Sequence, residues 1–164
     1  GTAYEVVARS DDVARMFRDV LPAWVLAPET SFSIYGERGV IDIVAWHPDQ
    51  RALLIIELKT DISDVNELVG TVGRKRRLAS QVVRERGWIP ETLSSWVIVA
   101  TGRTNRARVA RHAAMLRAAF PADARTMRAW LRHPAASIAA RSFWSGGDSD
   151  GSHAARRRVR PKAA

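Results

Sequence analysis

Cysteine is absent from this 164-residue sequence, which excludes disulfide bonds and thiolate metal sites. Histidine is scarce, and His47, His112, His133 and His153 are scattered without the spacing of a zinc site. No apolar run approaches the roughly 20 residues of a membrane span, and no signal-peptide pattern is present. We therefore expect a cytoplasmic protein whose single domain is long enough to form a hydrophobic core.

Acidic and basic residues are distributed unevenly along the chain. The formal net charge is +9, yet residues 1–73 carry 12 acidic side chains against 6 basic ones. Residues 74–117 reverse this balance, with 11 basic side chains against 2 acidic ones. A concentrated basic segment favours a polyanionic partner such as nucleic acid, because its cations neutralise phosphates. The alternative is that these residues form solvated helix faces.

Acidic residues also interrupt an otherwise apolar stretch from Glu37 to Lys59. Val40–Trp46 and Ala52–Lys59 are predicted strands, joined by a turn centred on Asp49 and Gln50. Antiparallel pairing around that centre sets residues opposite each other when their numbers sum to 99. The pattern therefore predicts that Asp42 faces Glu57, with Lys59 on the same side of the sheet.

Two facing carboxylates in an apolar hairpin destabilise it unless something compensates their charge. The two candidates are a divalent cation and the ammonium group of Lys59. Oxygen ligands alone suit Mg²⁺ or Mn²⁺, which also take phosphate oxygens. A lysine beside such a cation can orient or deprotonate a water molecule. The group therefore indicates metal-assisted hydrolysis of a phosphodiester.

The remaining pattern predicts an α/β domain over residues 11–145, with a lead-in over 1–10 and a disordered basic tail over 146–164. Helices are expected from about Asp11 to Leu21, from Asp61 or Ser63 to Gly87, and through Val109 to Pro121. Additional strands are expected over Glu29–Tyr35, Ser95–Ala100, Ala124–Leu131 and Ser142–Trp144.

The second of these helices carries a run of basic residues. Arg74 and Arg77 fall on its outer face, whereas Arg76 falls within the apolar stripe and Lys75 lies at its margin. Arg76 either reaches the acidic pair or extends past the core to a surface acid. We take Arg38, Arg74, Lys75, Arg76 and Arg77 as candidates for DNA contacts.

The spacing of Asp42 from Glu57-Leu58-Lys59 resembles the signature of the PD-(D/E)XK nuclease superfamily. The expected order of elements is also similar to the restriction-endonuclease-like αβββαβ core, a mixed central sheet flanked by helices. Within that family, GERGVIDIVAWHP, ELKT and GRKRRLA resemble bacterial nuclease-like domains that often accompany an N-terminal helix-turn-helix segment. Because the chain begins with Gly1, we expect such a segment upstream in a longer protein.

The resemblance implies that Asp42 and Glu57 bind Mg²⁺ and that Lys59 positions or activates the attacking water. Ile41 stands where the family name has proline. A further acid usually joins the site; Glu37 is one candidate, and Glu5, Asp12 and Asp19 are weaker ones. The implied activity is a Mg²⁺-dependent DNA endonuclease, often homodimeric in this family. The alternatives are an inactive DNA-binding or ligand-sensing domain of a transcriptional regulator, whose Lys59 only pairs with the acids, and an RNA-processing nuclease.

Overall fold

A mixed five-stranded sheet forms the centre of the computed structural model, which describes residues 3–144 and the side chains from Arg9 to Trp144. The tail expected over 146–164 lies outside the described residues. The strands are β1 (Val25–Ile34), β2 (Glu37–His47), β3 (Ala52–Lys59), β4 (Thr92–Ala100) and β5 (Ala139–Trp144), in that spatial order. β1, β2 and β3 pair antiparallel, whereas β3, β4 and β5 pair parallel.

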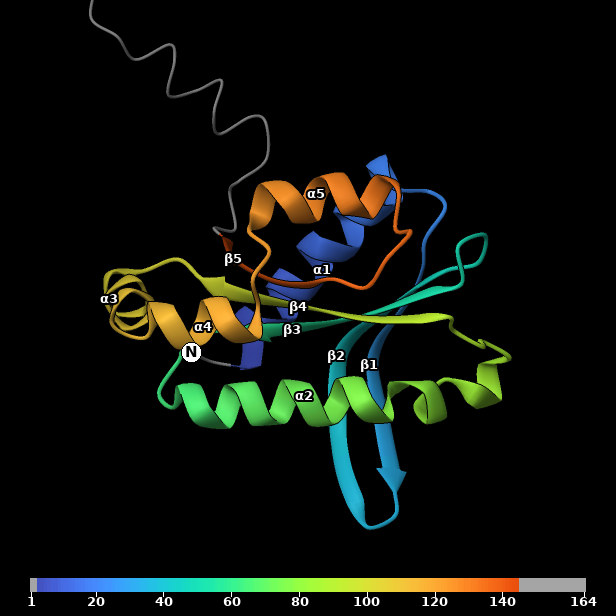
Figure 1. Ribbon diagram of the computed structural model, residues 1–164, viewed down its shortest axis with the longest axis horizontal. Coiled ribbons are helices and arrows are strands. Elements are labelled where there is room, and N and C mark those ends of the chain that lie inside the picture. Colours follow the sequence, from blue (N-terminus) through green and yellow to red (C-terminus); the bar gives the residue numbers. More distant parts are fainter. Residues whose placement is uncertain (1–2, 145–164) are drawn as a thin grey trace, which may run out of the picture.

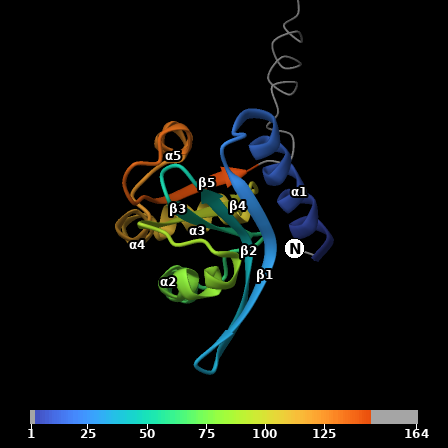
Figure 2. The same ribbon diagram turned by 90° about the vertical axis from the view of Figure 1, so that its right-hand side faces the viewer.

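Helices cover both faces of this sheet (Figures 1 and 2). One apolar cluster joins the sheet to α2 (Val65–Val82), α3 (Arg103–Arg111) and α4 (Ala113–Ala119). The other joins it to α1 (Ala3–Val20) and α5 (Ala124–Arg132), and a short 3-10 helix, η1 (Arg84–Arg86), follows α2. The general α/β class with a mixed sheet flanked by helices is therefore confirmed.

The central hairpin has the predicted register. The five pairs of β2 with β3 run from Ile43–Ile56 to His47–Ala52, and each pair of numbers sums to 99. The turn between the strands is closed by bonds from Arg51 N–H to the Pro48 carbonyl and from Gln50 N–H to His47 Nδ1. β3 and the part of β2 from Ile43 to His47 are buried because helices cover both faces there, whereas Arg38 and Val40 near the β1–β2 turn are exposed.

Several boundaries and one element differ from the sequence predictions. β1 begins at Val25 and not at Glu29, and α2 ends at Val82 and not at Gly87. Residues 124–132 form helix α5 and not a strand, because Asp123 caps the helix by accepting from Thr126 N–H, and Met127 and Leu131 bury one helical face. α1 begins at Ala3, so most of the expected lead-in is helical. The helix expected up to Pro121 is divided into α3 and α4 at His112. β5 is longer than expected.

Candidate active site

Asp42 and Glu57 meet where β2 and β3 stop pairing through their backbones. Beyond the Ile43–Ile56 pair, Asp42 N–H donates to Glu57 Oε2 at 3.0 Å. Leu58 N–H donates to Asp42 Oδ2 at 2.8 Å. Each carboxylate thus takes a backbone donor of the opposite strand, and the predicted facing pair is brought together.

The neighbouring strand is distorted beside Asp42. β1 and β2 pair in one register from Pro28–Ile43 to Thr30–Ile41, but the intervening Glu29 has a φ of 50°. A residue other than glycine in the left-handed region stores strain of roughly 1–3 kcal/mol, and such strain concentrates at functional sites. Glu29 lies opposite Asp42 in the β1–β2 hairpin, so the distortion coincides with the position where the backbone pairing of β2 with β3 ends.

Glu57 is buried on the face of the sheet that α2 covers, with 4% of its surface exposed. Its Oε1 forms an ion pair with Nζ of Lys75, and that nitrogen also donates to the Val40 carbonyl at 2.6 Å. Burial and the charge of Asp42 raise the pKa of Glu57 above its ordinary value of 4.5, while Lys75 opposes that rise. Lys75 therefore supplies part of the compensation that we expected from a cation or from Lys59.

Lys59 ends β3 two positions beyond Glu57, so strand alternation places both side chains on the α2 face. Its backbone carbonyl accepts from Arg9 Nη1 of α1 at 3.0 Å, and Arg9 also contacts Thr60 Oγ1. The side chain is half-buried, and its ammonium group has no hydrogen-bond or ion-pair partner among the described residues. Lys59 is thus held through its backbone while its charged end stays available.

The other candidate acids do not join this pair. Glu37 pairs with Ile34 beside the β1–β2 turn, and its Oε1 is 3.3 Å from Nη2 of Arg77. Asp12 pairs with Arg15 at 3.5 Å, and Asp19 is exposed near the end of α1. The side chain of Glu5 lies outside the described part of the chain.

Lys75 and Arg76 of α2 lie differently from what we expected, whereas Arg77 lies on the outer face as predicted. Lys75 is the buried member, and Arg76 instead donates through Nε to the Leu93 carbonyl at 3.1 Å. Neither alternative expected for Arg76, the acidic pair or a surface acid, describes this bond, and the neighbouring Lys75 is the residue that meets Glu57. Arg38 and Arg77 are exposed, and Arg74 is half-buried.

Helix α3 brings further arginines to the end of β3. β3 and β4 are parallel, so their carboxyl ends lie side by side. The buried Asn105 of α3 bonds both ends, because its amide group donates to the Thr60 and Ala100 carbonyls, each at 2.9 Å. Arg103, Arg106 and Arg111 are exposed on this helix. The sequence showed them as basic residues without acids, but only the parallel pairing places their helix beside Lys59.

The donor set fits a cation that needs few protein ligands. Among the residues that the structure describes, no group of three or more acidic or histidine side chains gathers. Mg²⁺ keeps several waters and binds through one or two carboxylates together with phosphate oxygens. Asp42 Oδ1 has no hydrogen bond within the described residues. Glu57 Oε1 becomes available when its bond with Lys75 opens.

None of the described helices combines the length and apolar character needed to cross a membrane.

Comparison of the chain with protein-family models, with curated proteins and with solved structures gives no match. The geometry around Asp42, Glu57, Lys59 and Lys75 is therefore what indicates the function of this chain.

Proposed function

We propose that this chain is a metal-dependent endonuclease of the PD-(D/E)XK type that hydrolyses DNA phosphodiester bonds. The observation that carries the proposal is the pair of carboxylates, Asp42 and Glu57, held at the point where β2 and β3 separate, with Lys59 on the same face. The order α1-β1-β2-β3-α2-β4 supports it, because the αβββαβ core of that family has the same order.

Asp42 and Glu57 would hold Mg²⁺ or Mn²⁺, which polarises a phosphate and lowers the pKa of a bound water. The chain's own residues do the rest. Backbone N–H groups of Asp42 and Leu58 fix the two carboxylates in place. Lys59 presents an ammonium group that can orient the attacking water. Lys75 neutralises Glu57 before a cation is bound, which limits the cost of burying that charge.

DNA is the proposed substrate because the exposed arginines of α3 lie at the same sheet edge as Lys59. Arginines bind phosphate through several parallel donors and so suit a nucleic-acid backbone. Arg38, at the tip of the β1–β2 hairpin, and Arg77 on α2 would add further contacts to the phosphates of the bound DNA. Lys75 is buried, so its proposed role is in the site and not on the DNA surface.

The test is cleavage of supercoiled plasmid with Mg²⁺ or Mn²⁺ by the wild type, Glu57→Ala and Lys59→Ala. We expect nicking or linearisation by the wild type and a loss of roughly 10²-fold or more in both variants. Glu91→Ala is the matched control, because this exposed carboxylate pairs only with Arg51. Equal cleavage by all variants, or none by the wild type at high protein concentration, would refute the proposal.

A second readout does not depend on catalysis. Mg²⁺ that binds only the folded state raises its stability, by about 2.7 kcal/mol when present at 100 times the Kd. We expect this increase in the wild type and in Lys59→Ala, and its loss in Asp42→Ala. An equal increase in all three would place the cation elsewhere.

One observation favours the alternative of a non-catalytic DNA-binding module. Glu57 already has a buried cationic partner in Lys75, and among the described residues only two acids meet at the site. Such a module would bind DNA with an affinity that falls steeply as salt rises, because counterions compete for the phosphates. It would show no cleavage with Mg²⁺ or Mn²⁺ and no stabilisation by either.

A further inference from the structure

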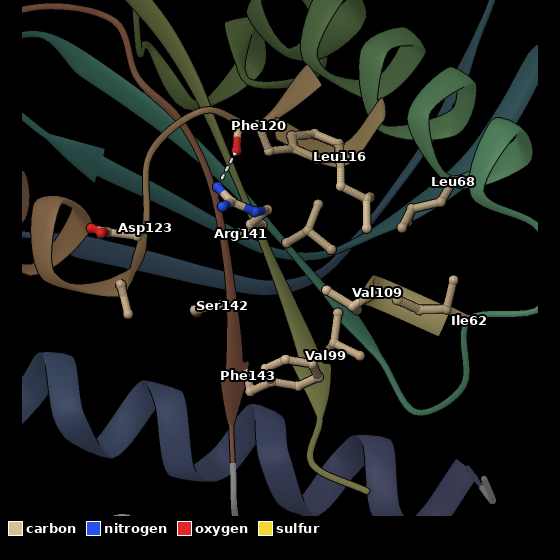
Figure 3. A pocket seen from close by; sticks show the side chains of 12 residues that line it. Ile62, Leu68, Val99, Val109, Leu116, Phe120, Asp123, Arg141, Ser142 and Phe143 are labelled. Atoms are coloured by element: carbon tan, nitrogen blue, oxygen red, sulfur yellow. Dashed lines mark hydrogen bonds between the residues drawn. The ribbon is translucent and has the colours of Figure 1, made fainter. Parts of the chain in front are cut away.

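A second site lies on the α2 face of the sheet, one strand away from the candidate active site. A pocket of about 290 Å³ opens between β4, β5 and the helices α2, α3 and α4 (Figure 3). Its walls are mainly apolar and include Val97, Val99, Leu116, Phe120 and Phe143. Because Val97 pairs with Glu57 and Val99 with Lys59 in the parallel ladder, the pocket borders the active-site strand without containing its residues.

One cationic side chain, Arg141 of β5, lines this apolar space. Its Nη1 donates to the Phe120 carbonyl at 2.7 Å (Figure 3). It also donates to the Ala122 carbonyl at 3.4 Å, and the two bonds fix the guanidinium group. A guanidinium group has five N–H donors. Within the described residues, Nε and Nη2 of Arg141 have no hydrogen-bond partner.

The acid in the pocket lining, Asp123, is engaged by the neighbouring helix. Asp123 is exposed at the start of α5, and its Oδ1 accepts from Thr126 N–H at 2.9 Å as the helix cap. The charge of Arg141 contributes to lowering the pKa of Asp123, but no ion pair joins the two residues, and Figure 3 shows the carboxylate apart from the guanidinium group. The pocket thus combines an apolar interior with a positioned cation that retains unused donors.

We propose that this pocket binds a small apolar carboxylate, with the carboxylate on Arg141 and the hydrocarbon part against Val99, Leu116 and Phe143. Ligand pockets in proteins commonly have this composition, an apolar lining with a few fixed polar groups that orient the ligand. A cavity of about 150 Å³ holds benzene, so a space of about 290 Å³ suits roughly ten to twelve non-hydrogen atoms. Octanoate and 3-phenylpropionate fall within that size.

This site goes beyond the proposed nuclease activity and does not depend on it. The pocket uses none of Asp42, Glu57 or Lys59. Loss of cleavage in the active-site variants would therefore leave ligand binding unchanged, and each proposal can fail without the other.

The test is calorimetric titration of the full 164-residue chain with octanoate, with 3-phenylpropionate, and with 1-octanol as the uncharged match. We expect both carboxylates to bind, and 1-octanol to bind more weakly. Arg141→Gln should weaken octanoate binding roughly tenfold to a hundredfold, since it removes charge-assisted hydrogen bonds. Arg128→Gln, at an exposed position of α5, is the control and should leave binding unchanged.

Val109→Phe provides an independent test, because an aromatic ring at this half-buried lining position would fill the pocket. We expect it to abolish octanoate binding while the Tm stays near that of the wild type. The proposal is overturned if octanoate does not bind the wild type at millimolar concentration. Binding of 1-octanol as tight as that of octanoate, or unchanged octanoate binding by Val109→Phe, would also overturn it.

Discussion

Lys75→Met removes the cation that compensates the buried carboxylate of Glu57 and keeps an unbranched side chain in its place. Glu57 would remain 4% exposed beside Asp42, and the Val40 carbonyl would lose its donor. Breaking a buried ion pair by removing one partner costs about 3–5 kcal/mol, because the other charge stays buried without a counterion. A domain of this size has about 5–15 kcal/mol in total, so the loss is large.

The loss should depend on pH because it comes from an ionised carboxylate. The pKa of Glu57 is raised from 4.5 by burial and by Asp42, so the folded state binds a proton more tightly than the unfolded state does. Stability from this group is therefore fully present below pH 4.5 and is lost as pH rises through the raised pKa. Without Lys75 that pKa rises further, so the variant should approach the wild type in acid and fall below it near neutral pH.

Urea denaturation followed by tryptophan fluorescence, from pH 4 to 8, measures the free energy of unfolding of each variant. Glu57→Gln combined with Lys75→Met removes both charges and should recover most of the loss, since neutral replacements of buried pairs are often tolerated. Arg77→Met is the matched control, because its exposed pair with Glu37 is worth only about 0–1 kcal/mol. A loss below about 1 kcal/mol at pH 7 in Lys75→Met, or a loss that does not vary with pH, would refute the reasoning.

Three further outcomes are expected from the same denaturation measurements. Asn105→Ala should cost about 2–4 kcal/mol, because this buried side chain bonds both the end of β4 and the segment after β3. Gly39→Ala should destabilise the fold by about 1–3 kcal/mol, since the added Cβ would lie 2.8 Å from the Phe32 ring. Gly70→Ala should instead stabilise α2 by up to about 1 kcal/mol, because no atom lies within 4 Å of the added Cβ. Asp123→Ala should lower the free energy of unfolding at neutral pH, because α5 loses its helix cap. That difference should disappear in acid, because the hydrogen bonds with Thr126 hold the pKa of Asp123 below its ordinary value of 3.8, and the stabilisation is lost as pH falls through this lowered pKa.

The hairpin was predictable because its information is local. Two apolar runs around a turn set the register, and the register set Asp42 opposite Glu57. The strand predicted over residues 124–131 was wrong for a related reason. Alternation and helical spacing compete in so short a segment, and the cap at Asp123 together with Met127 and Leu131 decides for the helix.

The sequence by itself determined the α/β class, the facing carboxylates and the side of β3 on which Lys59 lies, because strand alternation and turn position need no distant contact. Only the tertiary structure decided that Lys75, and not Arg76, meets Glu57, because one step along a helix turns a side chain by about 100° and packing sets the final rotation. The tertiary structure also placed α3 beside Lys59. It placed Arg141 in the lining of the apolar pocket. α3 and the end of β3 are more than forty residues apart in the sequence. The pocket residues come from several elements, which adjoin only once β4 and β5 pair in parallel.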